Sequence, residues 1–260
     1  MVSVKNFITG NISRKILLTR LIPLMFLILY GTVFIAGMIY PSAFDWRVLV
    51  MSELSNPQGN PAGFFYPSVG MTVVGVMMIP VLGYFHKRLN KICKGTTITG
   101  SIFFIVGIFG MIAISIFMDP IGPIIFGIDN VHSYFAVLAT LGMLLAFFFY
   151  GFSLLKDRKS GKRQFNQPLL IAGAIMLWSL FLGLVISQGI LMFVDPGWGT
   201  PGLDWLDGSI LPKPPLFFSL ALWEWPAIIG IFVYVVLLAI MIPEDVEATP
   251  RRKKEVKVEV

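Results

Sequence analysis

The chain has 260 residues, of which 56% are hydrophobic and only 13% charged, and its mean hydropathy is +0.82. Soluble domains are about 45–50% apolar and about a quarter charged, so this composition excludes an ordinary soluble domain and indicates a membrane protein. The 23 phenylalanines exclude a largely disordered chain, and the single cysteine, Cys93, excludes a disulfide scaffold.

Six segments are apolar enough to cross about 30 Å of hydrocarbon as helices of about 20 residues. They are residues 16–40, 64–85, 97–118, 131–155, 168–194 and 216–242. They do not alternate with period two, which disfavours a β-barrel, and the first is too long for a signal peptide. The sequence therefore predicts an all-α, polytopic membrane protein with one six-helix domain over residues 1–242 and a charged, disordered tail over 243–260.

The basic residues indicate the orientation. Of the 20 Lys and Arg, 18 lie at the N-terminus, in the second and fourth connections and in the tail, all on one side of the predicted membrane. Cytoplasmic segments carry an excess of Lys and Arg. We therefore expect a multi-pass protein of the cell membrane with both termini in the cytoplasm. The net charge of +6 then reflects this orientation, and we expect no binding to nucleic acid.

The opposite face, called the outer face below, is acidic and rich in tryptophan. It holds eight of the 14 acidic residues and five of the six tryptophans. These residues are Asp45, Glu53, Asp119, Asp129, Asp195, Asp204, Asp207 and Glu224, with Trp46, Trp198, Trp205, Trp223 and Trp225. Tryptophan is enriched at membrane interfaces, so anchoring beside solvated acids is one interpretation. An outer cap that binds lipid or a partner is the other.

The first outer connection, residues 41–63, contains a helix signal. Ser42 and Asp45 have the spacing of a capping box, and the stretch from Trp46 to Leu54 is mostly apolar, which predicts a short helix lying in the interface. The run 55–61 is dense in turn-forming residues. We expect this connection to fold against the bundle.

The fourth span begins with Asp129 and Asn130, either of which can cap a helix that has His132 in its first turn. The residues that share a helical face with His132 are Ala136, Ala139, Thr140 and Met143, and we expect that face to point into the bundle. Gly142 and Ala146 form a pair of small residues four apart, which permits close helix packing.

Glu224 lies near the start of the sixth span, between two tryptophans. An acid at this depth faces either the bundle interior or a wet cavity, because its charge is costly in lipid. The alternative is a carboxylate that is favoured by the helix dipole and reaches up to water.

Two short elements and the six spans carry a resemblance. Ser52-Glu53-Leu54-Ser55-Asn56-Pro57 lies in the first outer connection, and Asp129-Asn130-Val131-His132 opens the fourth span. The chain resembles a prokaryotic six-helix membrane family that is similar to the DRAM-like proteins and to the lipid-remodelling partners of GPI-anchor synthesis. Those relatives have a similar Ser-acid-Leu element and a His near the start of the fourth helix. The resemblance implies the fold and points to the residues Ser52, Glu53, Asn56, Asp129 and His132. It does not extend to residues 195–215.

Missing motifs limit the chemistry. The two histidines, His86 and His132, fall on opposite sides of the predicted membrane, which excludes bis-histidine haem ligation and a three-histidine zinc site. The sequence has no phosphate-binding glycine loop, no GxSxG element and no HExxH element. We expect no cofactor and no bound metal.

One group of outer residues remains as a candidate site. His132, Glu53 and Asp129 are the candidates for acid–base catalysis, because a histidine beside carboxylates suits proton transfer. The candidates for ligand binding are Ser52, Asn56, Arg47, Glu224 and Asp119. The first hypothesis is a non-catalytic protein whose outer cap binds membrane lipid or a partner, which includes a packing helix or a second copy of the chain. The alternatives are an intramembrane lipid-modifying enzyme that uses His132 and a small-solute transporter.

Overall fold

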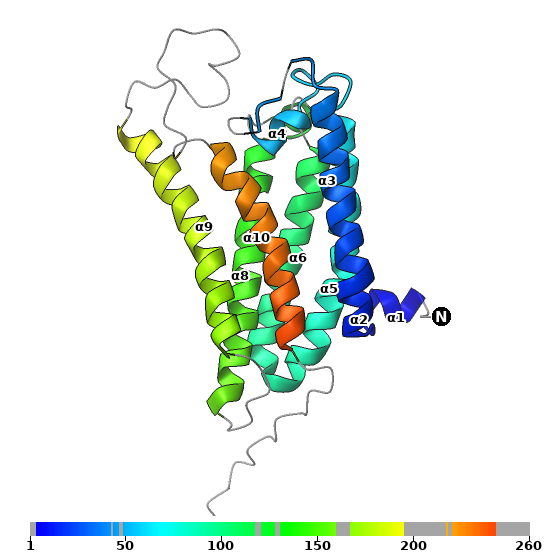
Figure 1. Ribbon diagram of the computed structural model, residues 1–260, viewed down its shortest axis with the longest axis vertical. Coiled ribbons are helices and arrows are strands. Elements are labelled where there is room, and N and C mark those ends of the chain that lie inside the picture. The colour runs from blue at the N-terminus through cyan, green and yellow to red at the C-terminus, as the bar shows by residue number, and fades with distance from the viewer. Residues whose placement is uncertain are drawn as a thin grey trace, which may run out of the picture.

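The computed structural model of the protein is all-α (Figure 1). The structure describes residues 4–42, 44–46, 49–117, 121–127, 131–159, 167–194, 217 and 220–242. Its elements in chain order are α1 (Val4–Ile8), α2 (Arg14–Ile16), the π-helical turn η1 (Leu17–Leu21), α3 (Ile22–Met38), α4 (Met51–Leu54), α5 (Phe65–Ile92), α6 (Lys94–Ile116), α7 (Ile121–Phe126), α8 (Val131–Lys159), α9 (Gln167–Val194) and α10 (Leu220–Met241).

The six predicted spans are confirmed as helices. Within the described residues, the helices long and apolar enough to cross a membrane are Arg14–Met38, Phe65–Ile92, Lys94–Ile116, Val131–Lys156, Pro168–Ser187 and Leu220–Met241. The first of these runs through α2, η1 and α3 without a break. The predicted tail over 243–260 and the tryptophan-rich residues 195–215 lie outside the described part of the chain.

Successive long helices run in opposite directions and form one bundle (Figure 1). Helices α1 and α2 lie at the same end of the bundle as the C-terminal end of α10. There, an Nη atom of Arg14 donates to the carbonyl of Ile242 over 2.9 Å. This is called the basic end below, because Lys87, Arg88 and Lys94 also lie there. Helix α4 lies at the other end, called the α4 end.

The second connection is shorter than the sequence predicts. Helix α5 continues to Ile92 and α6 begins at Lys94, so only Cys93 separates two helices that the sequence places eleven residues apart. Lys, Arg and Leu are good helix formers, and no Pro or Gly interrupts residues 86–94. Long basic side chains also extend from a helix end toward water, so the charge does not require a loop.

Close packing between α6 and α8 forms the centre of the bundle. A Cβ atom on Gly142 would lie 2.5 Å from the backbone nitrogen of Gly107, and one on Gly110 would lie 2.5 Å from that of Ala139. Gly142 and Ala146 are both buried, so the predicted pair of small residues does serve close helix packing. The adjoining core is aromatic, with Tyr84, Phe85, Phe104, Phe147 and Tyr150 fully buried.

The short helix of the first outer connection is present but smaller than expected. The sequence predicts a helix from Trp46 to Leu54, whereas α4 covers only Met51–Leu54. Trp46 lies in a turn, and Val50 precedes the helix in extended conformation without capping it through a side chain. The expected cap at Ser42 and Asp45 therefore does not begin α4. The reason is a tertiary contact: the first backbone N–H of α4, that of Met51, donates to a side chain of α10, so that no neighbouring side chain is needed as a cap.

Candidate functional site

Helix α10 holds the first outer connection in place. An Oε atom of Glu224 accepts a hydrogen bond from the backbone N–H of Met51, over 2.6 Å. The indole N–H of Trp225 donates to the carbonyl of Leu49 over 3.3 Å. The first N–H groups of a helix have no intrahelical partner and favour an anion, so the Glu224 carboxylate serves as a remote cap for α4. Of the two interpretations of Glu224, the structure favours the one in which it turns inward, toward protein.

Asn60 fixes the other side of the connection. Its side chain is fully buried, and its amide nitrogen donates to the carbonyls of Leu54, over 3.0 Å, and Ala36, over 3.3 Å. These bonds tie the turn after α4 to the last turn of α3. Met51 and Leu54 are themselves buried against that helix end. The expectation that this connection folds against the bundle is confirmed.

A row of aromatic rings lies beside α4. Ring centroids of Tyr40 and Phe44 are 5.2 Å apart, those of Phe44 and Trp46 are 4.8 Å apart, and those of Trp46 and Trp225 are 5.2 Å apart. The Trp46 ring rests on Gly37, where a Cβ atom would come within 2.8 Å of it. Trp46 nevertheless keeps 41% of its surface exposed. The row therefore presents an accessible indole next to the acidic residues.

Glu53 is a partly buried carboxylate in this region. Burial raises its pKa, and a hydrogen bond with the Asn56 side chain acts in the opposite direction. Burial also raises the pKa of Tyr40, and the charge of Glu53 raises it further. An Oε atom of Glu53 and the Tyr40 hydroxyl both border Gly59, where a Cβ atom would lie 3.4 Å from each. A small polar group, made of Glu53, Tyr40 and Asn56, thus lies around Gly59.

The structure brings some of the predicted site residues together. Glu53, Asn56 and Glu224 share the α4 end, and Ser52 lies in α4 itself. His132 lies in the first turn of α8, as the capping signal predicts, and is partly exposed. Helix α4 packs against α3 and α10, so the contacts described for Glu53 and Glu224 do not include α8.

Three predicted residues, Arg47, Asp119 and Asp129, lie outside the described residues. Among those that the structure describes, no three His, Cys, Asp or Glu side chains are grouped as they would be to hold a metal ion. The roles of His132, Glu53 and Asp129 in catalysis, and of the five other residues in binding, stay predictions.

Sequence reasoning missed three residues of the α4 end. Asn60, Tyr40 and the indole N–H of Trp225 all make specific contacts there. Asn60 is hidden in a run of turn formers, where an asparagine is expected for local reasons. For Trp225 the neighbouring acid is a signal, because Glu224 and Trp225 both reach the backbone just before and at the start of α4, the acid at the Met51 N–H and the indole at the Leu49 carbonyl.

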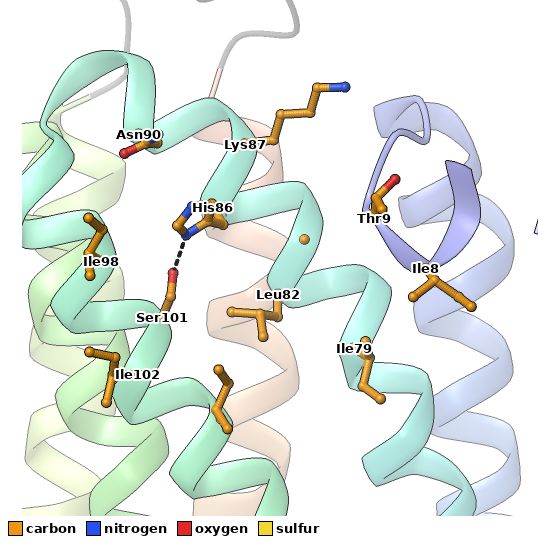
Figure 2. Close-up of a pocket in the computed structure, with 12 residues that line it drawn as sticks. Ile8, Thr9, Ile79, Leu82, His86, Lys87, Asn90, Ile98, Ser101 and Ile102 are labelled. Carbon is orange, nitrogen blue, oxygen red and sulfur yellow. Dashed lines mark hydrogen bonds between the residues drawn. The ribbon is translucent and has the colours of Figure 1, made fainter. Parts of the chain in front are cut away.

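The sequence also gives no indication of a groove at the basic end (Figure 2). It has a volume of about 700 Å3 and lies between α1, α5 and α6. Its lining residues are Ile8, Thr9, Ile79, Leu82, Gly83, His86, Lys87, Asn90, Ile98, Ser101, Ile102 and Ile105. His86 was assigned no role by the sequence; its Nδ1 lies 2.7 Å from the hydroxyl of Ser101.

Comparison with known proteins assigns the chain to a family. The model of a family described as a protein of unknown function, DUF998, matches residues 23–241, which include most of the first span and the whole of the other five. Neither a curated protein nor a solved structure matches the chain.

Proposed function

We propose that this chain, which belongs to the DUF998 family of proteins of unknown function, binds membrane lipids whose head groups carry an ammonium group. The six candidate spans make it a multi-pass membrane protein. The proposed binding site is the α4 end, where Glu53, Glu224 and the aromatic row lie. We further propose that the protein lies in the cell membrane with its basic end and both termini on the cytoplasmic side. The α4 end is then the outer cap.

The observation that supports this proposal best is a pair of neighbouring carboxylates without a basic partner. Glu53 and Glu224 repel each other when both are ionised. Within the described residues, neither makes an ion pair with a Lys or Arg, and their polar partners are the Met51 N–H and the Asn56 amide. Burying carboxylates without a counter-charge is unfavourable. A cationic group bound at Glu53 relieves that cost.

The aromatic rings favour an ammonium group over other cations. A cation over the face of a Trp ring is attracted by the quadrupole of the ring, and amines and quaternary ammonium groups are recognised in this way. Trp46 is the exposed member of the row, and its ring packs at a tilt of 59° against that of Trp225, the neighbour of Glu224. The α4 end therefore has both carboxylates and an accessible indole ring.

A lipid is a suitable carrier of this ammonium group. The α4 end is the end of a membrane-spanning bundle, where aromatic residues lie at the level of the head groups. The Ser52-Glu53-Leu54 element, on which the resemblance to the DRAM-like proteins and the lipid-remodelling partners of GPI-anchor synthesis rests, forms part of the site. That resemblance supports lipid as the ligand class.

The two alternative functions, an intramembrane lipid-modifying enzyme and a small-solute transporter, stay predictions. An enzyme requires His132 within proton-transfer reach of a carboxylate and of the substrate, and a transporter requires a polar path through the bundle. No described contact joins His132 to Glu53 or Glu224. Association with a partner helix or with a second copy of the chain also stays a prediction.

The test is native mass spectrometry of the purified, delipidated full chain with two matched lipids. Phosphatidylethanolamine carries an ammonium group, whereas its N-acylated form has the same phosphate and chains but an uncharged nitrogen. At the α4 end we expect binding of the first lipid and not of the second, which is anionic and can occupy the basic end. Glu53→Gln should therefore reduce retention of phosphatidylethanolamine about fivefold and leave retention of its N-acylated form unchanged, since a partly exposed ion pair contributes about 1 kcal/mol.

Asp45→Asn is the matched control. It removes one negative charge from the same connection without touching the carboxylate pair, and we expect it to retain phosphatidylethanolamine as the wild type does. Equal effects of Glu53→Gln on the retention of the two lipids would contradict the proposal. Equal losses in Asp45→Asn and Glu53→Gln would show that general acidity, and no site at Glu53, attracts the amine.

A further inference from the structure

We infer that the groove at the basic end binds one anionic phospholipid, with the phosphate at Lys87 and an acyl chain along the isoleucines of α5 and α6. This site is separate from the α4 end and takes the opposite head-group charge. The shape, the charge and the polar groups of the groove each support it.

The shape of the groove fits a lipid chain. Figure 2 shows Lys87, His86 and Asn90 at one end of the groove, with aliphatic side chains further along. The stretch of α5 from Asn90 to Ile79 is about 16 Å long at 1.5 Å per residue, comparable with a large part of an extended acyl chain. The aliphatic residues of the wall are Ile79, Leu82, Ile98, Ile102 and Ile105. The groove is thus polar at the membrane surface and apolar toward the membrane interior.

The charge of the groove is positive and uncompensated. None of its twelve lining residues is acidic. The Lys87 ammonium donates to the Oδ1 of Asn11 over 2.9 Å, which is a neutral partner. Arg88, the next residue, donates to the carbonyls of Ile12 and Tyr84, which are neutral as well, and lies 3.7 Å above the Tyr84 ring. Within the described residues, these two cations therefore form no ion pair, and a phosphate at Lys87 supplies the missing anion.

Two further polar groups lie at the head-group end. The Ser101 hydroxyl donates to the carbonyl of Thr97 over 2.8 Å, so it accepts from His86 and the Nδ1 of His86 is the donor. This fixes the orientation of the imidazole ring in the wall of the groove. Asn90 has a buried Oδ1 without a hydrogen-bond partner. A buried acceptor of this kind is costly, and the Asn90 side chain that carries it lies at the head-group end of the groove.

The occupant is a phospholipid and not a soluble phosphate ester. The isoleucines of the groove are exposed in the absence of lipid, with 56% of Ile102 and 54% of Ile105 accessible. A soluble phosphate ester leaves them exposed, whereas an acyl chain in the groove covers them. Basic residues near a membrane surface attract anionic lipids by about 1 kcal/mol each. Phosphatidylglycerol combines the negative phosphate, the hydroxyl donors and the chain.

The experiment compares retention of phosphatidylglycerol with that of diacylglycerol, which has the chains but neither a phosphate nor an ammonium group, by the purified full chain in detergent, measured by native mass spectrometry. We expect the wild type to prefer phosphatidylglycerol and Lys87→Gln to lower that preference about fivefold. Lys91→Gln is the matched control, because Lys91 is an exposed cation on the same helix end and does not line the groove. We expect it to change the preference by less than about twofold.

A second variant tests the chain-binding part without altering charge. Ile102→Trp fills the groove, and we expect it to reduce phosphatidylglycerol retention while the thermal midpoint of the lipid-free protein stays unchanged. Glycerol 3-phosphate, which has the phosphate but no chain, should not displace the lipid. Equal effects of Lys87→Gln and Lys91→Gln would overturn the inference, and so would retention in Ile102→Trp or displacement by glycerol 3-phosphate.

Discussion

The two ends of the bundle satisfy their polar groups in different ways. At the α4 end, Glu224 and Trp225 reach from one helix to the backbone of the first outer connection, and the charge that remains is negative. At the basic end, Lys87 and Arg88 reach to the neutral oxygens of Asn11 and Ile12, and the charge that remains is positive. At the α4 end these hydrogen bonds fix the first outer connection, and at the basic end they fix the segment after α1. At neither end do they pair the charged side chain with an opposite charge. A membrane protein with this arrangement offers opposite charges to the two membrane surfaces.

The described residues of the two ends differ in the kind of surface that they form. The α4 end has aromatic rings and carboxylates, which suit the proposed ammonium head group. The basic end has a groove with an aliphatic wall, so it suits a whole lipid. The two proposals therefore assign head-group recognition to one end of the six-helix scaffold and chain recognition to the other.

The largest expected effect concerns which side of the membrane each end faces. Cys93, the single cysteine, lies between α5 and α6 at the basic end. Burial raises the pKa of its thiol, but hydrogen bonds with Thr96 and the charge of Lys156 outweigh burial, so the pKa is lowered. We expect a membrane-impermeant maleimide to label inside-out vesicles and not right-side-out ones. The double variant Cys93→Ala with Ser42→Cys, which moves the thiol to the α4 end, should reverse the pattern. Labelling of Cys93 from the outer side would contradict the orientation.

The next effect concerns the scaffold that joins the two ends. Gly142→Leu places a side chain against the backbone of α6, and we expect it to destabilise the protein by about 1–3 kcal/mol or more, because overpacking forces the helices apart. Lipid binding should weaken at both ends together. Gly95→Ala, where nothing lies within 4 Å, is the control and should not destabilise. Thermal unfolding in detergent measures both, and a harmless Gly142→Leu would show that the ends do not depend on this contact.

A smaller effect should be confined to one end. Glu224→Leu removes the acceptor of the Met51 N–H, and an unpaired buried donor costs about 1–3 kcal/mol. Glu224→Gln keeps an acceptor oxygen and should keep α4 in place. Proteolytic nicking of the first outer connection reports on this, with Glu224→Leu cut faster than Glu224→Gln. Phosphatidylglycerol binding at the basic end should not change. If it falls as well, the two ends are coupled and do not bind lipid independently.

The smallest effect is a pH dependence of amine-lipid binding at the α4 end. The pKa of Glu53 is raised in the folded protein, so between its ordinary value and the raised value the folded state holds more protons than the unfolded state. In that window, stability of the lipid-free protein falls as pH rises. Binding of phosphatidylethanolamine rises over the same window, about fivefold at most, because the ammonium group requires an ionised carboxylate. Both trends should flatten in Glu53→Gln, and a wild-type binding curve that falls with pH would contradict the site.

Much of the fold could be predicted from the sequence, because a membrane span is a local property of about 20 residues. The six helices, the position of His132 in the first turn of α8 and the packing role of Gly142 follow from composition and spacing. The start of α4 at Met51 could not be predicted, because its cap is supplied by Glu224 from a helix 173 residues away in the chain.

The candidate site was only partly predictable for the same reason. Glu53 and Asn56 were recognisable as polar residues of the first outer connection and Glu224 as an acid near the start of the sixth span, and the structure places all three at one end of the bundle. The groove at the basic end depends on how α1 lies against α5 and α6, which no local pattern encodes. A histidine and a lysine at the end of a span look like ordinary positive-inside residues until the groove beside them is seen.

The most direct test of the account is one native mass spectrometry measurement on the wild type, Glu53→Gln and Lys87→Gln, each equilibrated with an equal mixture of phosphatidylethanolamine and phosphatidylglycerol. The account predicts that Glu53→Gln loses bound phosphatidylethanolamine alone and that Lys87→Gln loses bound phosphatidylglycerol alone. If both variants lose the same lipid, or if neither changes the lipid bound, the two ends do not select lipids by opposite charge and the central claim is wrong.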